Sequence, residues 1–251
     1  MKYYFLSLLG IIFYSCNSTD EDISMNPQTQ ADIEIKHLPS KLTSSEKTTH
    51  FYYDNQDRLI RFEEKSTENL YAKEFSISYK DNLVNEIILK YESSDSYSYT
   101  NLYTFEYIED NVVITNLFTD INDYSVTQSR TIRIDMSNFL TSGYGIETTY
   151  DNKKNLVEII EDNTGTKNKF DNKNAIYKNV NSSQWLLYYV LKLGIHKENN
   201  PLEIHTIRTD RTETNSSVIS YEYNSEDFPV KQFITDDNYY TTETQIEYLT
   251  K

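Results

Sequence analysis

The sequence predicts an all-β protein built as an antiparallel meander of hairpins, and three observations lead to this prediction. The chain holds 23 Tyr and 11 Phe but only 5 Gly and 4 Pro, and aromatic residues favour a pleated, half-buried surface. From His50 onward, short stretches repeat one pattern: aromatic residues, then an Asp- or Asn-rich cluster, then aliphatic residues. The repeats are spaced by 26, 28 and 27 residues, enough for two strands and two turns, as measured between Tyr53, Tyr79, Tyr107 and Ile134.

The first residues predict an export signal. One positive charge in Met1-Lys2 precedes a mainly apolar run from Tyr3 to Tyr14, and the small residue Ser15 follows. As a helix, this run would be about 18 Å long, which is shorter than the roughly 30 Å hydrocarbon core of a bilayer. We therefore expect residues 1–15 to be removed as a signal peptide, and no later stretch of the sequence reaches a spanning length.

Cys16, the only cysteine of the chain, comes directly after this run. Phe13-Tyr14-Ser15-Cys16 resembles the lipobox of bacterial lipoproteins, although Phe13 stands where an aliphatic residue is usual and Tyr14 is bulky. The resemblance implies that Cys16 is lipidated and becomes the mature N-terminus, since several acyl chains on one residue anchor a protein durably. The alternative is a buried structural cysteine, but the polar residues that follow offer it no core to join.

Residues 16–31 are predicted to form a flexible acidic tether, because they lack apolar periodicity. The run Asn17–Asp22 resembles the signals that send lipoproteins of Bacteroidetes-type bacteria to the outer surface. The expected location is therefore the outer membrane, through a lipid anchor, with the chain exposed at the cell surface or on the periplasmic face. The formal net charge of −15 argues against nucleic acid as a partner, since phosphates would be repelled.

Residues 32–251 are expected to form one β-repeat domain. Side chains alternate up to each turn, so that Phe75, Ile77 and Tyr79 share one face of a predicted strand. Asp and Asn in the turns tolerate left-handed backbone conformations and can stand in for Gly. We expect an open, twisted sheet or a half-barrel. A two-sheet sandwich is the alternative, but the predicted strands are long and their connections short.

Three of the turns resemble YD repeats. They are Tyr53-Asp54-Asn55-Gln56-Asp57-Arg58-Leu59, Tyr150-Asp151 with Leu156, and Phe170-Asp171-Asn172. The family pattern has Gly in the turn, where this chain has Asp57 or Asn155. The resemblance covers most of residues 48–251 and implies a surface lipoprotein of uncharacterised function, Bacteroidetes-type. In that group of proteins a helix interrupts the series of hairpins.

One segment, Asn181–Gly194, breaks the hairpin pattern. Its apolar residues, a candidate N-cap at Ser182 or Ser183 and a stop at Gly194 predict a helix near residues 182–194. The favoured interpretation is that this helix covers the concave face of the sheet and adds core. The other interpretation is a contact patch for a ligand or partner, formed by Trp185, Tyr188 and Tyr189.

Metal and catalytic sites find little support in the sequence. The four histidines, His37, His50, His196 and His205, form no HExxH motif and no close pair, so neither a metal nor a cofactor is expected. Asp120–Asp123 and Asp236–Asn238 could bind calcium weakly, but ordinary turn chemistry is favoured because the EF-hand glycine and closing glutamate are missing. The sequence holds no GxSxG, P-loop or GxGxxG motif.

The preferred function is therefore a non-catalytic binding or scaffold lipoprotein of the cell envelope, with a protein or glycan partner. Two alternatives stay open: an extracellular hydrolase of polysaccharide or peptide, and a carrier of an apolar ligand. A carrier needs an apolar cavity, a glycan binder needs coplanar exposed rings, and a hydrolase needs two carboxylates roughly 5–10 Å apart across a cleft. The tyrosines fall in register with every hairpin, which favours cross-strand pairing over a glycan platform.

Overall fold

The computed structural model describes residues 35–120, 126–136, 141–142, 146–161, 164–193, 198–208 and 212–251. The described residues form one 16-stranded antiparallel sheet in the order β10-β11-β12-β13-β14-β15-β16-β1-β2-β3-β4-β5-β6-β7-β8-β9. The strands are β1 His37–Ser44, β2 Lys47–Tyr53, β3 Leu59–Ser66, β4 Tyr71–Lys80, β5 Leu83–Ser93, β6 Ser98–Ile108, β7 Asn111–Asp120, β8 Val126–Asp135, β9 Thr141–Ser142, β10 Ile146–Tyr150, β11 Leu156–Glu161, β12 Thr164–Phe170, β13 Pro201–Arg208, β14 Glu213–Tyr223, β15 Pro229–Thr235 and β16 Thr241–Thr250.

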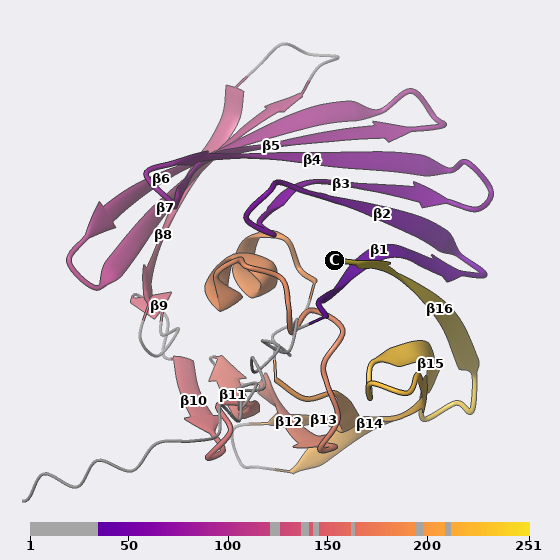
Figure 1. Cartoon of the computed structure of the whole chain (residues 1–251). Helices are drawn as coiled ribbons and strands as arrows, with labels where there is room; N and C mark the ends of the chain where they lie inside the picture. Colours follow the sequence, from indigo (N-terminus) through magenta and orange to yellow (C-terminus); the bar gives the residue numbers. More distant parts are fainter. Residues whose placement is uncertain are drawn as a thin grey trace, which may run out of the picture. The chain divides into compact units, whose positions relative to one another are not determined.

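The predicted all-β meander of hairpins is confirmed. Consecutive strands pair throughout, except that β9 and β10 form the two edges of an open sheet and β16 pairs with β1. Figure 1 shows the sheet curving around the segment that joins β12 to β13. The strands reach 11 residues, and some connections have only two, such as Asp81-Asn82. The sandwich alternative is therefore wrong, because all the described strands belong to a single sheet.

Four connections share one loop geometry, which an Asp or Asn sets at the first position. In the loop 54–58, Oδ1 of Asp54 accepts hydrogen bonds from the backbone N–H groups of Gln56 at 2.9 Å and Arg58 at 3.0 Å. The fourth residue, Asp57, has a φ of 62°. The same two bonds and a positive φ at the fourth residue recur in the loops 151–155, 224–228 and 236–240. A side-chain oxygen thus organises turns in which non-glycine residues adopt left-handed conformations.

A β-bulge comes directly after several turns, and a side chain of the next strand binds the bulge carbonyl. The register shifts where Tyr53 faces Leu59, and the Tyr79 hydroxyl on β4 donates to the Leu59 carbonyl at 2.9 Å. A bulge interrupts the ladder and leaves a backbone group to be paired elsewhere. Equivalent bonds join Tyr53 to Pro39, Tyr107 to Val84, Tyr221 to Pro201 and Tyr248 to Pro229, and the Asn168 amide donates to Leu156.

These five tyrosines combine a half-buried ring with a hydrogen-bonded hydroxyl. Burial raises the pKa of each of their hydroxyls above the ordinary value for tyrosine. They therefore stay protonated, and remain donors, over the whole range in which proteins normally work. Three of the four prolines occupy bulge positions, where a strand tolerates a residue without a backbone N–H: Pro39, Pro201 and Pro229.

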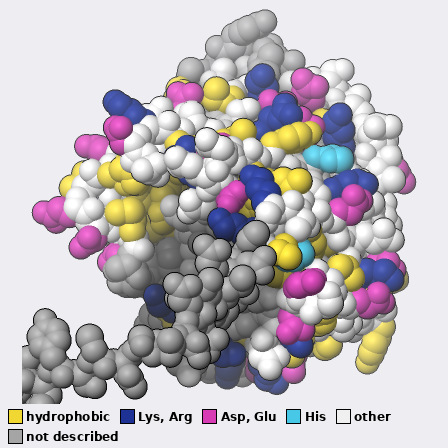
Figure 2. Space-filling model, viewed as in Figure 1, with side chains coloured by type: hydrophobic (Ala, Val, Ile, Leu, Met, Phe, Trp, Pro, Cys, Tyr) yellow, Lys and Arg dark blue, Asp and Glu magenta, His cyan; other side chains and the backbone are white. Residues whose placement is uncertain are grey.

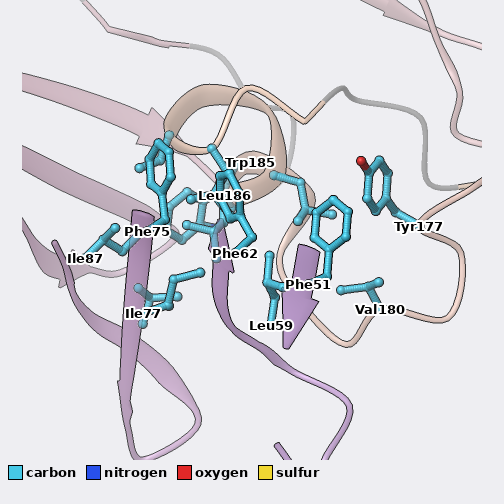
Figure 3. Close-up of a cluster of buried hydrophobic side chains, with 14 of the residues drawn as sticks. Phe51, Leu59, Phe62, Phe75, Ile77, Ile87, Tyr177, Val180, Trp185 and Leu186 are labelled. Atoms are coloured by element: carbon cyan, nitrogen blue, oxygen red, sulfur yellow. The ribbon is translucent and has the colours of Figure 1, made fainter. Parts of the chain in front are cut away.

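The main core lies on the concave face of β1–β8. Phe51, Phe62, Phe75 and Leu89 face one another across β2–β5, and the rings of Phe62 and Phe75 stack with centroids 4.3 Å apart. Figure 3 shows Trp185 and Leu186, from the segment between β12 and β13, beside these side chains. The interpretation in which this segment covers the concave face and supplies core is confirmed.

The helix in this segment is shorter than the predicted 182–194. It is a π-helix, η1 Leu186–Val190, and no side-chain hydrogen bond caps it. Ser182 does not act as an N-cap, because its Oγ accepts the backbone N–H of Leu59 at 3.3 Å. Lys192 has a φ of 54°, which ends the helix, while the predicted stop Gly194 lies outside the described residues. Contacts between this segment and the sheet thus limit the helix to fewer residues than the sequence pattern predicts.

The segment grows out of a loop of the shared kind. Oδ1 of Asp171 accepts the N–H of Lys173 at 3.0 Å, as in the other loops. The second bond, however, comes from the N–H of Asn200 at 3.0 Å, so Asn200 takes the place of the fifth loop residue. Residues 174–199, here called the insertion, therefore enlarge one hairpin loop without changing its ends.

Hydrogen bonds fix the insertion to three of the other loops. Asn155 and Asn199 clasp each other through a side-chain amide bond of 3.0 Å and a backbone bond of 3.2 Å. Asn181 donates to the Asp57 carbonyl at 2.9 Å, and Asn174 to Asp227 at 3.1 Å. These loops lie at one end of the sheet, because alternate connections of a meander lie at alternate ends. We call it the insertion end, and the opposite end the cavity end.

The two ends of the described chain are joined at Asp57. Its side chain is 10% exposed and accepts hydrogen bonds from Nζ of Lys36 and Nζ of Lys251, each at 2.8 Å. Lys36 and Lys251 also exchange two backbone hydrogen bonds of 3.1 Å, and Figure 1 marks the C-terminus beside β1. Hydrogen bonds from Lys251 and Lys36 hold the pKa of Asp57 below its usual value.

This lowered pKa predicts a specific pH dependence of stability. A carboxyl with a depressed folded-state pKa contributes stability that is present above its unfolded pKa of about 3.9 and is lost as pH falls through the folded value. Asp57→Asn should lower the free energy of unfolding by about 1 kcal/mol at neutral pH, and the loss should shrink below about pH 4. Asn tolerates the positive φ. Urea unfolding from pH 7 to pH 2.5 measures the difference.

Asp81→Asn is the matched control. Asp81 also has a positive φ, 50°, but its side chain is exposed, so this variant should unfold within about 0.5 kcal/mol of the parent at each pH. An Asp57→Asn variant that is as stable as the parent at neutral pH would contradict a stabilising role for the hydrogen bonds between Asp57 and the two lysines.

Candidate ligand-binding cavity

A cavity of about 750 Å³ lies between the concave face of the sheet and the insertion. The insertion is bonded to loops at the insertion end, and its described residues form one short helix, η1, leaving a cavity inside the curve. One wall comes from β1–β6, a second from β13–β16 and the third from the insertion. The apolar and aromatic lining residues are Leu42, Phe62, Phe75, Leu89, Tyr99, Tyr103, Ile176, Tyr177, Val190, Leu191, Leu193, Pro201, Tyr221 and Ile234.

On the concave face of the sheet, an apolar row of side chains is followed by a polar row two residues further along the strands. The row Phe51-Phe62-Phe75-Leu89 crosses β2–β5. Two residues further toward the cavity end, the row on the same face reads Thr49-Glu64-Lys73-Tyr91, and two residues along a strand span about 7 Å. The cavity therefore has an apolar interior and a polar margin.

Glu64 is the centre of the polar margin. Lys47 Nζ lies 2.6 Å from its Oε2, and Lys73 Nζ lies 3.1 Å from its Oε1. The Tyr71 hydroxyl donates to the same Oε1 at 3.1 Å. Burial alone would raise the pKa of Glu64, but the hydrogen bonds and charges of both lysines outweigh it and lower the pKa. Glu64 is thus a fully paired anion that holds two ammonium groups beside the cavity.

A row of aromatic rings continues along this margin. The centroids of Tyr71 and Tyr91 are 6.1 Å apart, those of Tyr91 and Tyr99 4.8 Å, and those of Tyr99 and Phe118 5.1 Å. The first two pairs are stacked, so their faces contact each other rather than forming a coplanar surface. Burial and the Glu64 carboxylate raise the pKa of Tyr71 to about 12. Cross-strand pairing, the favoured interpretation of the tyrosines, is confirmed for this row.

Asn101 brings one further polar group to the cavity wall. It follows Leu89 in the inner row, on β6, and lines the cavity. Its Oδ1 is buried and has no hydrogen-bond partner among the described residues. Burying a carbonyl oxygen without a partner costs free energy. A ligand that donates a hydrogen bond to Oδ1 of Asn101 would remove this cost.

Two of the three residues predicted to form a contact patch, Trp185 and Tyr188, pack in different cores. Trp185 is 3% exposed and packs on Phe105, with ring centroids 5.8 Å apart. Tyr188 is half-buried and packs on the second, smaller core of Leu156 and Ile159. The side chain of Tyr189 lies outside the described part. Trp185 thus serves mainly the core.

The sequence-based reasoning missed Lys47, Glu64 and Lys73. A signal was nevertheless present, since alternation along the strands puts Glu64 on the face of Phe62, and Lys73 on the face of Phe75. Charged residues at inward positions of a predicted strand indicate either an ion pair or a site. The missing information was the cross-strand register that brings the three side chains together.

A second, smaller hollow of about 590 Å³ lies at the insertion end, where Arg58, Tyr79 and Ser182 line it. The Arg58 guanidinium lies 2.7 Å from the Asp54 carboxylate and 4.4 Å from the centre of the Tyr79 ring. Its charge and its flat face are therefore engaged within the protein, and the hollow has mainly polar lining residues.

The other candidate residues have structural partners or lie outside the described part. Oδ1 of Asp236 accepts two backbone bonds within its own loop, so turn chemistry is confirmed there. His205 lies 2.9 Å from Glu203 and 3.3 Å from Glu213. The described residues contain no group of three or more His, Cys, Asp or Glu arranged to bind a metal. Cys16, Asn122, Asp123 and His196 lie outside them.

Comparisons with known proteins give no family. No family model matches the sequence, and no curated protein matches it. A solved porin-like protein from Bacteroides vulgatus ATCC 8482 is 14% identical over 85% of this chain and 99% of its own, with a TM-score of 0.48. A porin-like protein from Bacteroides uniformis ATCC 8492 is 12% identical over 86% and 96%, with a TM-score of 0.40. Likenesses of this size do not assign a function.

The charged residues do not form single-sign regions on the visible face. Figure 2 shows acidic and basic side chains interspersed there.

Along the described ranges, no helix combines the length and the apolar character that crossing a bilayer requires.

Proposed function

We propose that this chain is a non-catalytic binding protein of the bacterial cell envelope that carries a small, largely apolar ligand in the 750 Å³ cavity. The cavity is the observation that supports this function over the others. Its volume falls within the range of about 300–1,000 Å³ that is typical of small-molecule sites. Apolar and aromatic residues make up 14 of its 26 lining residues, and the other 12 are polar or charged; a site of this kind can hold a largely apolar ligand and orient it through polar groups.

The alternatives receive less support from the geometry. A glycan platform would need coplanar exposed rings, whereas Tyr71, Tyr91 and Tyr99 stack on one another. A hydrolase would need an acid and a base facing each other. Glu64, a carboxylate at the cavity margin, is paired with two lysines and a tyrosine hydroxyl. We therefore place the carrier hypothesis ahead of the surface scaffold for a protein or glycan.

Filling the cavity tests the carrier function. Leu42 on β1 lines the cavity and is half-buried, so Leu42→Trp should put an indole ring into the ligand space. We expect the parent chain to bind the uncharged fluorophore N-phenylnaphthylamine with a rise in fluorescence, and the variant to bind it at least about tenfold more weakly. Titration of the full chain with the fluorophore measures both affinities.

Leu249→Trp is the control for this experiment. Leu249 is 44% exposed and is not part of the cavity lining, so its replacement should leave the affinity unchanged. Equal binding by the parent and Leu42→Trp, with both chains folded by circular dichroism, would contradict ligand binding in this cavity.

The proposed location at the envelope rests on the first residues of the sequence. The apolar run Tyr3–Tyr14, the lipobox-like Phe13–Cys16 and the acidic residues after it support an outer-membrane lipoprotein with its lipid on Cys16. A lipid anchor would hold the carrier at a membrane. The resemblance of its loops to YD repeats stays a prediction.

Replacing the lipidated residue tests the anchor. Cys16→Ala should move the protein from the membrane fraction to the soluble fraction of the producing bacterium, because the acyl chains can no longer be attached. Immunoblotting of the two fractions measures the shift, and Ser18→Ala, two residues away, should stay with the membrane. A Cys16→Ala protein that still sediments entirely with the membrane would refute lipidation at this residue.

A further inference from the structure

The polar margin of the cavity carries a positive charge in a strongly acidic chain. The charged residues that line the cavity are Glu46, Lys47, Glu64, Lys73 and Lys192. Three ammonium groups against two carboxylates leave the site with an excess of one positive charge, whereas the chain as a whole has a formal net charge of −15. A site whose sign opposes that of the whole chain favours an anionic ligand group.

The two lysines at Glu64 retain hydrogen-bonding capacity. An ammonium group has three donors, and the carboxylate of Glu64 takes one from Lys47 and one from Lys73. Because both ammonium groups bind the same carboxylate, they are held close together at the cavity margin. This arrangement can bind an anion with charge-assisted hydrogen bonds while Glu64 keeps the lysines in place.

The apolar rows lie directly inside this charged margin. Phe62 and Phe75 are two residues from Glu64 and Lys73 on the same strands and the same face. The insertion covers this apolar region with Val190, Leu191 and Leu193. A ligand that places an anion at the lysines would therefore place the rest of its length against the apolar wall.

We infer that the cavity binds a single-chain amphiphile with an anionic head group, a carboxylate or a phosphate, whose head contacts Lys47 and Lys73 and whose apolar chain lies along Phe62 and Phe75. This inference rests on the proposed carrier function and names the class of its ligand. Lys192, two residues after η1 in the insertion, adds a third positive charge to the cavity lining.

The experiment compares amphiphiles that share one chain and differ in the head group. The probes are dodecanoate, dodecyl phosphate, dodecanol and dodecyltrimethylammonium, each below its micellar concentration, competing with the uncharged fluorophore for the full chain. The two anions should bind at least about tenfold more tightly than dodecanol, and the cation more weakly than dodecanol. A preference for one anion over the other identifies the head group.

Variants of the lysines then locate the head group. Lys47→Met and Lys73→Met should each weaken dodecanoate binding by about tenfold and leave dodecanol binding unchanged. Lys47→Arg should retain the anion preference. Lys65→Met is the control, because Lys65 is exposed on the outer face of β3. If a single variant fails to fold, Lys47→Met combined with Glu64→Gln removes both charges of the pair.

The outcomes separate this inference from the function on which it rests. Equal affinity for dodecanoate and dodecanol, or lysine variants that weaken both probes alike, would overturn the anionic head group and leave an apolar carrier. Displacement of the bound fluorophore by none of the four probes would overturn the amphiphile ligand, whereas a fluorophore that does not bind the parent chain at all would overturn the carrier function.

Discussion

The curved sheet depends on hydrogen bonds that reach the carbonyls of its β-bulges. A bulge bends and twists a strand, but it also interrupts the backbone ladder. Here a tyrosine hydroxyl from the next strand binds the bulge carbonyl in five places, as Tyr79 does at Leu59 and Tyr248 at Pro229. Phenylalanine could fill the same space but could not donate. This requirement gives a physical reason for tyrosine, rather than phenylalanine, at five of the 23 tyrosine positions of the chain.

Curvature in turn creates the space that the insertion and the cavity share. In a flat sheet, the side chains of this face would lie open to solvent. The curved sheet can enclose Phe62 and Phe75 together with a single covering segment. The insertion is bonded to loops at one end through Asn155, Asn181 and Asn199. The space at the other end is bounded by the polar residues around Glu64. The point of attachment of the insertion thus determines where the cavity lies and which residues of the sheet line it.

Much of the fold could be predicted from local sequence signals. Alternation around Phe75 and Ile77 predicted strands, and Asp54 and Asp151 predicted turns, because strand period and turn chemistry act over a few residues. The helix was placed correctly but made too long, since Ser182 bonds Leu59 rather than capping the helix. Long-range contacts decided that outcome, and the sequence alone does not reveal them.

The candidate site was harder to predict than the fold. Trp185 was the most prominent residue of the predicted contact patch, and the structure buries it against Phe105. Lys47, Glu64 and Lys73 look like ordinary strand residues until the register of β2, β3 and β4 brings them together. The pairing of β2 with β3 includes a bulge, and a bulge shifts the register by a residue that periodicity does not reveal.

The hydroxyl protons of the tyrosines test the central claim most directly. In a chain with labelled tyrosine rings, NMR spectra should show slowly exchanging hydroxyl protons for Tyr53, Tyr79, Tyr107, Tyr221 and Tyr248, because each is half-buried and bonded to a carbonyl. The exposed Tyr239 and Tyr240 should exchange too fast to be observed. If the five hydroxyl protons exchange as fast as those two, they do not hold the bulges, and this explanation of the curved sheet is wrong.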